Sequence, residues 1–318
     1  MNRFFLLAVL AGSAVQAQTT NDPVVLTVDV ENYTAYRGDV LDPAKVAKDG
    51  NPTTGTVAAF LETNQVGDIV AVNGRPAKGL YQSVAFIMPF RANPTAGQAI
   101  ADLDSSGFFH CSWEILGPDG AYIGTLLDGG ANTGHGLLGG NGAFLGINGI
   151  HTAQTLVAQR SASSSEDPSK RRANGPSGKI RATFYLYPSF RPTVQMTANG
   201  PSIAHLDYSP VTAANPAQPG ETLIVAATGL GPVKPGIQPA GGEPFSGPPY
   251  QEVNSPVTVA FNGKELPVIN RVGWPGQKDL YWLDFQVPSD ATAGTATFQL
   301  TAAWIPGPSV TIPVGAAR

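Results

Sequence analysis

Cysteine is almost absent from this chain, which has 318 residues and a single cysteine, Cys111. An internal disulfide is therefore excluded, and packing alone must hold the fold together. The chain also lacks an excess of basic residues, because 19 Lys and Arg stand against 23 Asp and Glu, for a formal net charge of −4. Bulk charge thus gives no reason to expect nucleic acid or an anionic membrane surface as a partner.

Long hydrophobic runs are missing too, apart from a short one at the N-terminus. Arg3 precedes an apolar run from Phe4 to Leu10, and small residues follow as far as Ala17. This layout is typical of a signal peptide, and the run is shorter than the roughly 20 residues that a spanning helix needs. We expect cleavage near Ala17, no membrane span, and a mature protein that is secreted, periplasmic or at the cell surface.

Helical periodicity is scarce, whereas turn-forming residues are abundant, with 37 Gly and 28 Pro. Residues 43–48 and 96–101 are the two stretches that could form short helical turns. The remaining sequence indicates short strands joined by Asn-Gly, Pro-Asp-Gly and Gly-Gly turns. This pattern predicts an all-β protein. In the N-terminal part we expect about eight strands, at residues 24–33, 55–64, 67–74, 79–89, 108–117, 121–129, 143–156 and 179–188.

The segment from Phe108 to Ile115 has the clearest two-residue alternation in the chain. One face carries Phe109, Cys111, Trp113 and Ile115, and the opposite face carries the more polar set of Phe108, His110, Ser112 and Glu114. Because successive strand residues point to opposite faces of a sheet, the first set is predicted to be core. Cys111 is then a small buried side chain.

Two features divide the chain into domains. The stretch Ser161 to Gly178 lacks apolar periodicity, which predicts an exposed, mobile loop at 161–178 between two strands. Further on, prolines recur at positions 188, 192, 201, 210, 216 and 219, and each removes a backbone donor that a central strand would need. We place the boundary near Thr197, which gives a signal peptide at 1–17, one domain at 18–196 and a second at 197–318.

The second domain has a distinctive order of turn and strand residues. They are Pro219-Gly220-Glu221, Thr228-Gly229-Leu230-Gly231-Pro232, Val257-Thr258-Val259, Asn262-Gly263-Lys264, Trp274-Pro275-Gly276, Tyr281, Phe285-Gln286-Val287-Pro288 and Ala293-Gly294. In this order they resemble the IPT/TIG-type Ig-like domains that recur at the C-termini of exported soil-bacterial proteins. The resemblance covers about Ser202 to Val314 and implies a β-sandwich that serves as a spacer or binding module.

The first domain resembles the allene oxide cyclase and dirigent-like β-barrels. The residues that carry the resemblance are Gly67-Asp68-Ile69-Val70, Asn73-Gly74-Arg75-Pro76-Ala77-Lys78-Gly79 and the glycine-rich run from Gly139 to Gly149. The resemblance implies an antiparallel barrel of about eight strands, with room for one small apolar ligand. No catalytic carboxylate of that family aligns with a position here, so the resemblance assigns no catalytic residue.

Sequence motifs for common catalytic and cofactor chemistry are missing. The glycine-rich runs at 139–149 and 229–231 lack the dinucleotide-binding spacing, so we interpret them as turns and expect no cofactor. The four histidines, at 110, 135, 151 and 205, show no metal-ligand spacing. A metal site would have to be assembled wholly by tertiary contacts, and we expect none. No Gly-x-Ser-x-Gly elbow occurs, and a mid-strand cysteine is a poor nucleophile.

Seven residues are the best candidates for a site inside the barrel. The acid–base candidates are His110, Glu114 and Asp102, with Asp104 beside it, and the ligand-binding candidates are Arg75, Tyr81 and Trp113. They are chosen because proton transfer needs titratable groups gathered in one cavity. The alternative is that His110 and Glu114 point to solvent on the outer wall, and this alternative is favoured because apolar side chains fill an interior at lower cost.

Three functions remain open at this point. The leading hypothesis is a secreted, non-enzymatic protein whose barrel binds a small apolar ligand or presents a surface, with the Ig-like domain as spacer or interaction module. The second is a cyclase, isomerase or dirigent-type enzyme acting in the barrel lumen. The third is a structural or adhesive surface protein with a protein or surface-glycan partner, contacted by aromatic residues such as Trp274 and Tyr250.

Overall fold

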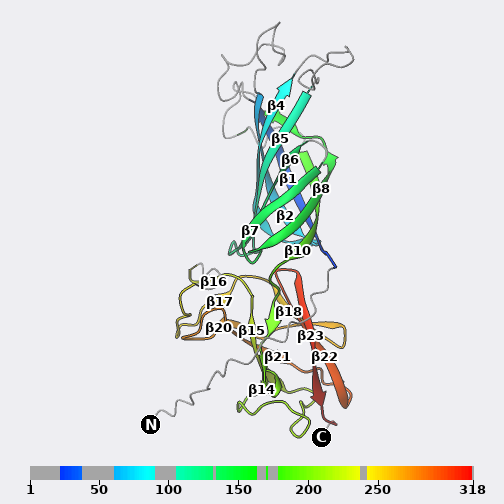
Figure 1. The fold of residues 1–318 in the computed structure, drawn as a ribbon, viewed down its shortest axis with the longest axis vertical. Helices are drawn as coiled ribbons and strands as arrows, with labels where there is room; N and C mark the ends of the chain where they lie inside the picture. The colour runs from blue at the N-terminus through cyan, green and yellow to red at the C-terminus, as the bar shows by residue number, and fades with distance from the viewer. Residues whose placement is uncertain are drawn as a thin grey trace.

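The computed structural model describes residues 22–37, 61–89, 105–131, 134–162, 170, 178–236 and 242–316. Figure 1 shows a β-barrel at one end of the molecule and a β-sandwich at the other. No α-helix occurs among these residues. The predicted fold class is therefore confirmed: an all-β protein in which an eight-stranded antiparallel barrel precedes an Ig-like β-sandwich.

The barrel is a closed meander in which each strand pairs with its neighbours in the chain. Closure comes from β1, which pairs with β2 on one side and with β10 on the other. The wall strands are β1 (Val24–Arg37), β2 (Leu61–Val72), β4 (Lys78–Pro89), β5 (Ser105–Leu116), β6 (Tyr122–Ala131), β7 (Gly134–Gly142), β8 (Ile147–Val157) and β10 (Gly178–Pro188). Two short strands, β3 (Arg75–Pro76) and β9 (Arg160–Ala162), attach to β2 and β1.

The number of wall strands matches the prediction, but the break expected between residues 64 and 67 is wrong, and residues 55–60 lie outside the described ranges. Residues 55–64 and 67–74 were expected as separate strands, whereas β2 runs unbroken from Leu61 to Val72. Gly67 lies within β2 beside the irregular part of β1, where a Cβ atom would stand 2.3 Å from Val30 Cγ1. This glycine therefore permits a close approach of two strands and does not end one.

The glycine-rich run also differs from its interpretation as a turn. Gly139 to Gly142 belong to strand β7, residues 147–149 belong to β8, and the turn is confined to the segment between them. Gly140 pairs with Leu126 of β6, and a Cβ atom on it would lie 2.5 Å from the carbonyl oxygen of Phe144. The missing side chain lets the turn fold back, so that Phe144 is fully buried.

Several sequence predictions concern residues outside the described ranges. These are the signal peptide at 1–17, the helical turns at 43–48 and 96–101, the carboxylates Asp102 and Asp104, and most of the loop at 161–178. At the start of that loop, Ser161 and Ala162 pair in parallel with β1 as part of β9. Among the described residues, the chain has no helix long and apolar enough to cross a membrane.

The C-terminal domain consists of two main sheets packed face to face. The first sheet contains β11 (Thr193–Val194), β14 (Ile203–His205), β15 (Thr222–Thr228), β16 (Val233–Lys234), β17 (Glu252–Val253), β20 (Asn270–Gly273) and β21 (Tyr281–Gln286). The second contains β18 (Val257–Phe261), β19 (Lys264–Pro267), β22 (Gly294–Ala302) and β23 (Ile305–Val314). A small ribbon, β12 (Met196–Thr197) with β13 (Gly200–Pro201), completes the domain.

Alternating side chains from both sheets form the sandwich core. Leu283, Phe285 and Phe298 are fully buried there, and their strands show the predicted two-residue pattern. Asn262-Gly263 forms the hairpin turn between β18 and β19, with φ values of 48° and 79°. Trp274 lies half-buried, with its ring centroid 5.7 Å from that of Trp282 on the same sandwich.

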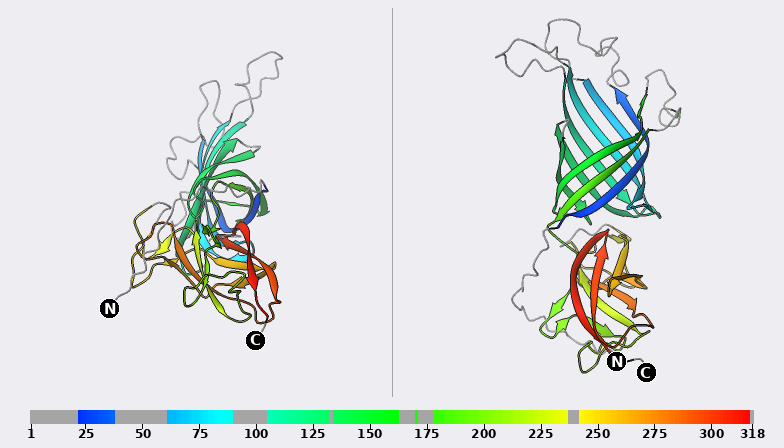
Figure 2. Two further views of the ribbon diagram at one scale, coloured as in Figure 1. Left: turned by 60° about the horizontal axis from the view of Figure 1, so that its bottom comes forward. Right: turned by 90° about the vertical axis from the view of Figure 1, so that its right-hand side faces the viewer.

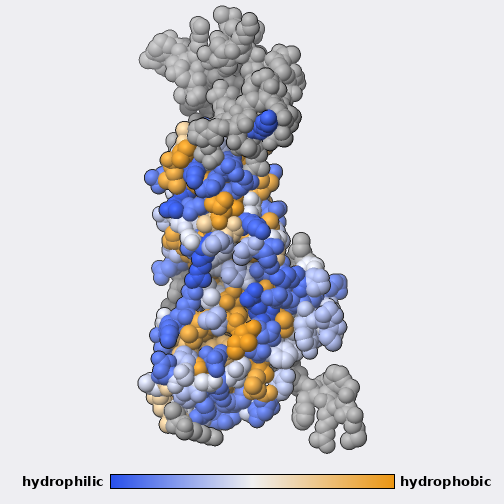
Figure 3. All heavy atoms as spheres, turned by 180° about the vertical axis from the view of Figure 1, so that it is seen from behind, coloured by the Kyte–Doolittle hydropathy of each residue, from blue (hydrophilic) through white to orange (hydrophobic). Residues whose placement is uncertain are grey.

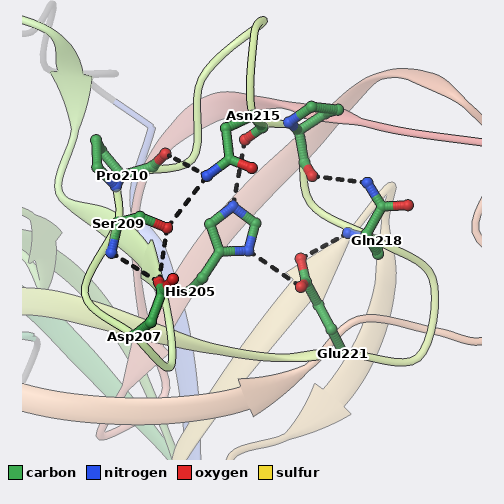
Figure 4. A network of polar contacts seen from close by, with 8 residues as sticks. His205, Asp207, Ser209, Pro210, Asn215, Gln218 and Glu221 are labelled. Carbon is green, nitrogen blue, oxygen red and sulfur yellow. Dashed lines mark hydrogen bonds and ion pairs between the residues drawn. The ribbon is translucent and has the colours of Figure 1, made fainter.

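A polar network holds the segment that connects β14 to β15 (Figure 4). The two ring nitrogens of His205 lie 3.1 Å from Glu221 Oε2 and 3.2 Å from the carbonyl oxygen of Asn215. Glu221 in turn accepts a hydrogen bond from the backbone N–H of Gln218 at 2.6 Å. Since loop backbone groups need such partners, we interpret the network as structural.

The barrel and the sandwich meet through the turn between β22 and β23 (Figure 2). Ala303 and Ile305 are buried in the barrel's hydrophobic core, and Trp304 packs against it. Around this contact, the side-chain amide of Asn254 donates to the carbonyl oxygen of Tyr122 at 2.8 Å. The sandwich therefore closes one end of the barrel, and the two domains share a core.

Candidate functional site

The interior of the barrel contains a layer of polar side chains that follows the strand pairing. Cys111 of β5 pairs with Asp128 of β6, and His135 of β7 pairs with His151 of β8. Directly opposite residues on one face of a sheet have neighbouring Cβ atoms, so register alone brings each pair together. The pairing of β6 with β7, with its register shift after Leu127, then brings the two pairs into contact.

Asp128 is the centre of this layer. Its side chain is fully buried, and it is the one buried carboxylate among the residues described. The indole N–H of Trp113 donates to Oδ2 at 2.6 Å, and His135 Nδ1 lies 2.9 Å from Oδ1. A buried carboxylate is costly unless it is paired, and these two contacts fix its orientation.

His151 lies beside the same carboxylate but is not hydrogen-bonded to it. Its Nδ1 atom is buried without a hydrogen-bond partner, 3.6 Å from Asp128 Oδ2. Burial lowers the pKa of His151, the negative charge of Asp128 opposes this effect, and nearby His135 lowers the pKa further. The imidazole is therefore neutral at pH 7, and Nδ1 has unused capacity for a ligand.

The thiol group of Cys111 belongs to the same polar layer. Its Sγ atom lies 3.9 Å from His135 Nδ1 and 3.9 Å from the hydroxyl of Tyr81. Burial raises the pKa of Cys111 to about 12, and the charge of Asp128 acts in the same direction. The thiol thus stays protonated at pH 7.

A second group of polar side chains continues from Cys111 along the wall. The hydroxyl of Tyr33 donates to Gln65 Oε1 at 2.6 Å, and the hydroxyl of Tyr81 lies 3.5 Å from the same oxygen. Burial raises the pKa of both tyrosines well above the ordinary value, so both remain neutral donors. Ser83, which pairs with Cys111, has a buried hydroxyl without a hydrogen-bond partner.

Aromatic rings surround the polar layer. Trp113 is fully buried, with its ring centroid 4.2 Å from that of Tyr81 and 5.2 Å from that of Phe184. The ring of His151 lies 5.0 Å from Phe184. Such walls exclude water and strengthen the electrostatic interactions between the groups inside them.

Solvent reaches this layer at His135. Its side chain is 19% exposed, whereas those of His151 and Asp128 are 6% and 0% exposed. His135 is the second residue of β7, at the strand end that lies away from the sandwich. His135 is therefore the member of this layer that contacts solvent, and Asp128 and His151 are buried behind it.

The residues predicted from sequence lie in three different environments. Tyr81 and Trp113 line the barrel interior beside Asp128, whereas His110 and Glu114 are exposed on the outer wall. The outer positions follow from the two-residue alternation, which places them opposite Cys111 and Trp113. Arg75 forms a surface ion pair with Glu265 of the sandwich at 2.7 Å, and Asp102 lies outside the described residues.

Sequence reasoning missed Asp128, His135 and His151 as a group. The signal for Asp128 was present, because it shares the inward face of β6 with Leu126, and a carboxylate on an apolar face is unusual. His151 likewise shares a face with Ile147 in β8. His135 is the second residue of a glycine-rich strand, and its sequence context gave no periodicity to use.

The geometry of the cluster excludes a nucleophile–histidine–carboxylate relay but permits ligand binding. In a nucleophile–histidine–carboxylate relay, the two ring nitrogens of the histidine face different partners. Here Nδ1 of His135 faces both Asp128 and Cys111, so the three residues do not form such a relay. The same convergence of S, N and O atoms suits the binding of a cation or of a hydrogen-bond donor.

A cleft at the domain junction is a weaker candidate site. Its lining includes Phe190, Arg191 and Asp279. The guanidinium of Arg191 already donates to the carbonyl oxygens of Pro306 and Asp22. Asp279 accepts the backbone N–H of Gly229 at 3.2 Å. Because these charged groups have structural partners, we assign the cleft to the packing of the domains.

The fold and the interior layer define a class of protein: an eight-stranded barrel with a buried Cys–Asp–His cluster, closed at one end by a β-sandwich. No family model matches this chain, and a search of curated proteins finds no match. The resemblances to IPT/TIG-type domains and to allene oxide cyclase or dirigent-like barrels therefore stay predictions.

Proposed function

We propose that this is an exported binding protein whose site is the barrel interior around Asp128. The observation that carries the proposal is a fully buried carboxylate beside an imidazole nitrogen that has no partner. A barrel that served only as scaffold would be more stable with apolar residues in these positions, because buried polar groups cost free energy unless they are satisfied.

The chemistry of the layer points to a ligand with a cationic or hydrogen-bond-donating group. Asp128 supplies negative charge, and the neutral His151 supplies a ring nitrogen that has no hydrogen-bond partner. Trp113 and Tyr81 supply apolar surface around them. The proposal thus keeps the expected small ligand of the barrel but gives it a polar group, where the sequence favoured an apolar molecule.

The sandwich has a specific part in this proposal. By inserting Ala303 and Ile305 into the barrel core, it closes the end near Phe144. A ligand would then enter from the opposite end, where His135 contacts solvent. The sandwich domain thus closes one end of the binding barrel, in addition to any role as a spacer.

Native mass spectrometry of the full chain tests the proposal, with Asp128→Asn as the variant and Glu114→Gln as its control. Glu114 is an outward-facing carboxylate on β5, so its substitution alters charge without altering the interior. We expect a bound small ligand in the wild type and in Glu114→Gln. Loss of a charge-assisted interaction of about 1.5–3 kcal/mol lowers the affinity of Asp128→Asn roughly 10- to 100-fold.

The contrary result would be equal ligand occupancy in all three proteins, or a wild type that carries no ligand under any loading condition. Circular dichroism of each variant is the folding control. Equal spectra with different occupancies would assign the loss to the site itself.

Acid–base catalysis in the lumen is a second candidate, favoured by the contact of Asp128 with His135. An enzyme of this kind would convert the bound ligand during incubation, and Asp128→Asn would stop conversion more strongly than binding. Analysis of the released ligand by mass spectrometry separates the two functions, because a binding protein returns it unchanged.

A further inference from the structure

The interior layer brings together three types of metal-ligating atom. Cys111 Sγ, a carboxylate oxygen of Asp128 and a ring nitrogen of His135 all lie within 4.8 Å of one another. They come from three consecutive wall strands, β5, β6 and β7, and are held by the register of the barrel. The sequence had predicted no metal site, because the spacing of these residues along the chain carries no signature.

The separations between these atoms fit a tetrahedral site of the zinc type. With metal–ligand distances of about 2.0–2.3 Å, neighbouring ligand atoms in a tetrahedron are roughly 3.3–3.6 Å apart. The observed separations are 3.9 Å from Cys111 Sγ to His135 Nδ1 and 2.9 Å from that nitrogen to Asp128 Oδ1. Shifts of a few tenths of an ångström in these side chains would bring the ligand atoms to the separations that a bound ion requires.

His151 lies next to this group through Asp128, although it is not one of the three residues whose ligand atoms all lie within 4.8 Å of one another. Its Nδ1 atom has no hydrogen-bond partner, its side chain is 94% buried, and Asp128 Oδ2 lies 3.6 Å away. This atom is an independent indication of a ligand, because a buried nitrogen without a partner costs free energy in the empty protein. Nitrogen coordination to a metal ion would remove that cost.

Residues around the proposed ligands hold them in place by hydrogen bonds, as in known metal sites. The indole N–H of Trp113 donates to Asp128 Oδ2 at 2.6 Å and so fixes the carboxylate. Partners of this kind orient the ligands and raise metal affinity. The partial exposure of His135 gives an ion a route from solvent.

We propose that Cys111, Asp128 and His135 bind a divalent transition-metal ion such as Zn²⁺, with His151 as the neighbouring nitrogen that moves in as the fourth ligand. The inference rests on the proposed function, since it names the ligand class of the same interior site. Sulfur and imidazole donors favour zinc, cobalt or nickel over the oxygen-preferring Ca²⁺ and Mg²⁺. Binding releases the proton of the Cys111 thiol to solvent, and each imidazole coordinates as a neutral ligand, so the site becomes a thiolate–carboxylate–imidazole set.

The test uses the full chain, freed of metal by a chelator and titrated with Zn²⁺ by calorimetry. We expect one ion per chain in the wild type and in His110→Ala, the matched control, because His110 is exposed on the outer wall next to Cys111. Cys111→Ser and His135→Ala should each bind Zn²⁺ at least 10-fold more weakly than the wild type. Loss of a residue that only supports a metal ligand already lowers metal affinity by about 10- to 100-fold. Thermal unfolding of the metal-free variants checks their fold.

Cobalt(II) spectroscopy of the wild type gives a second measurement that needs no variant. Cys111 is the single cysteine of the chain, so a thiolate-to-cobalt charge-transfer band identifies it as a ligand. The proposal is overturned if the wild type takes up no zinc, if the cobalt protein lacks this band, or if Cys111→Ser and His135→Ala bind like His110→Ala.

Native mass spectrometry separates failure of this inference from failure of the proposed function. An organic adduct that depends on Asp128, without metal uptake, would overturn the metal site and leave the binding barrel intact. The absence of both an organic adduct and metal uptake would overturn both proposals.

Discussion

Replacing Trp113 with alanine should lower the free energy of unfolding by about 3–5 kcal/mol, the cost typical of truncating a large buried aromatic side chain. Trp113 is fully buried and packs against Tyr81 and Phe184. The substitution leaves a cavity and also removes the N–H donor of Asp128. Urea denaturation followed by circular dichroism measures the change.

Trp113→Phe is the matched control for this prediction. Phenylalanine keeps most of the apolar ring but has no N–H to donate to Asp128, so we expect a smaller loss of about 1–3 kcal/mol for an unsatisfied buried acceptor. A loss below 1 kcal/mol in Trp113→Ala would contradict the packing described around the polar layer. Equal losses in the two variants would mean that the hydrogen bond, and not the ring, stabilises this region.

The all-β fold was predictable because two-residue alternation is a strong local signal. In β5 it correctly assigned Cys111, Trp113 and Ile115 to the interior and His110 and Glu114 to the outer face of the strand. The signal failed where glycine replaced the apolar residues of a strand. Strand β7, with five glycines in its nine residues, offered no alternation, and its residues from Gly139 onward were interpreted as a turn.

The interior cluster was only partly predictable, because it depends on the register of strands β5 to β8. Trp113 and Tyr81 were identified from their own strands. The partnership of Asp128 with His135 needed the register shift between β6 and β7, which leaves no pattern in the sequence. The contact of His135 with His151 could be predicted only if β7 had been recognised as a strand.

The last prediction concerns the contact between the domains and compares two isoleucines of strand β23. Ile305 is buried in the barrel core, and Ile312 is buried in the sandwich core. Each substitution by alanine should cost about 2–4 kcal/mol, because each removes a buried side chain of the same kind. We expect Ile305→Ala to speed hydrogen exchange in the barrel strands, and Ile312→Ala to speed it mainly in the sandwich strands.

The backbone of this turn supports a role in closing the barrel. Ala303 and Trp304 adopt positive φ values of 47° and 63°, in a region that costs a residue other than glycine about 1–2 kcal/mol. The burial of Ala303 and Ile305 against the barrel offsets this strain. If Ile305→Ala speeds exchange in the sandwich alone, the turn does not stabilise the barrel. Faster exchange in the barrel would show that the binding site and the sandwich share one cooperative core.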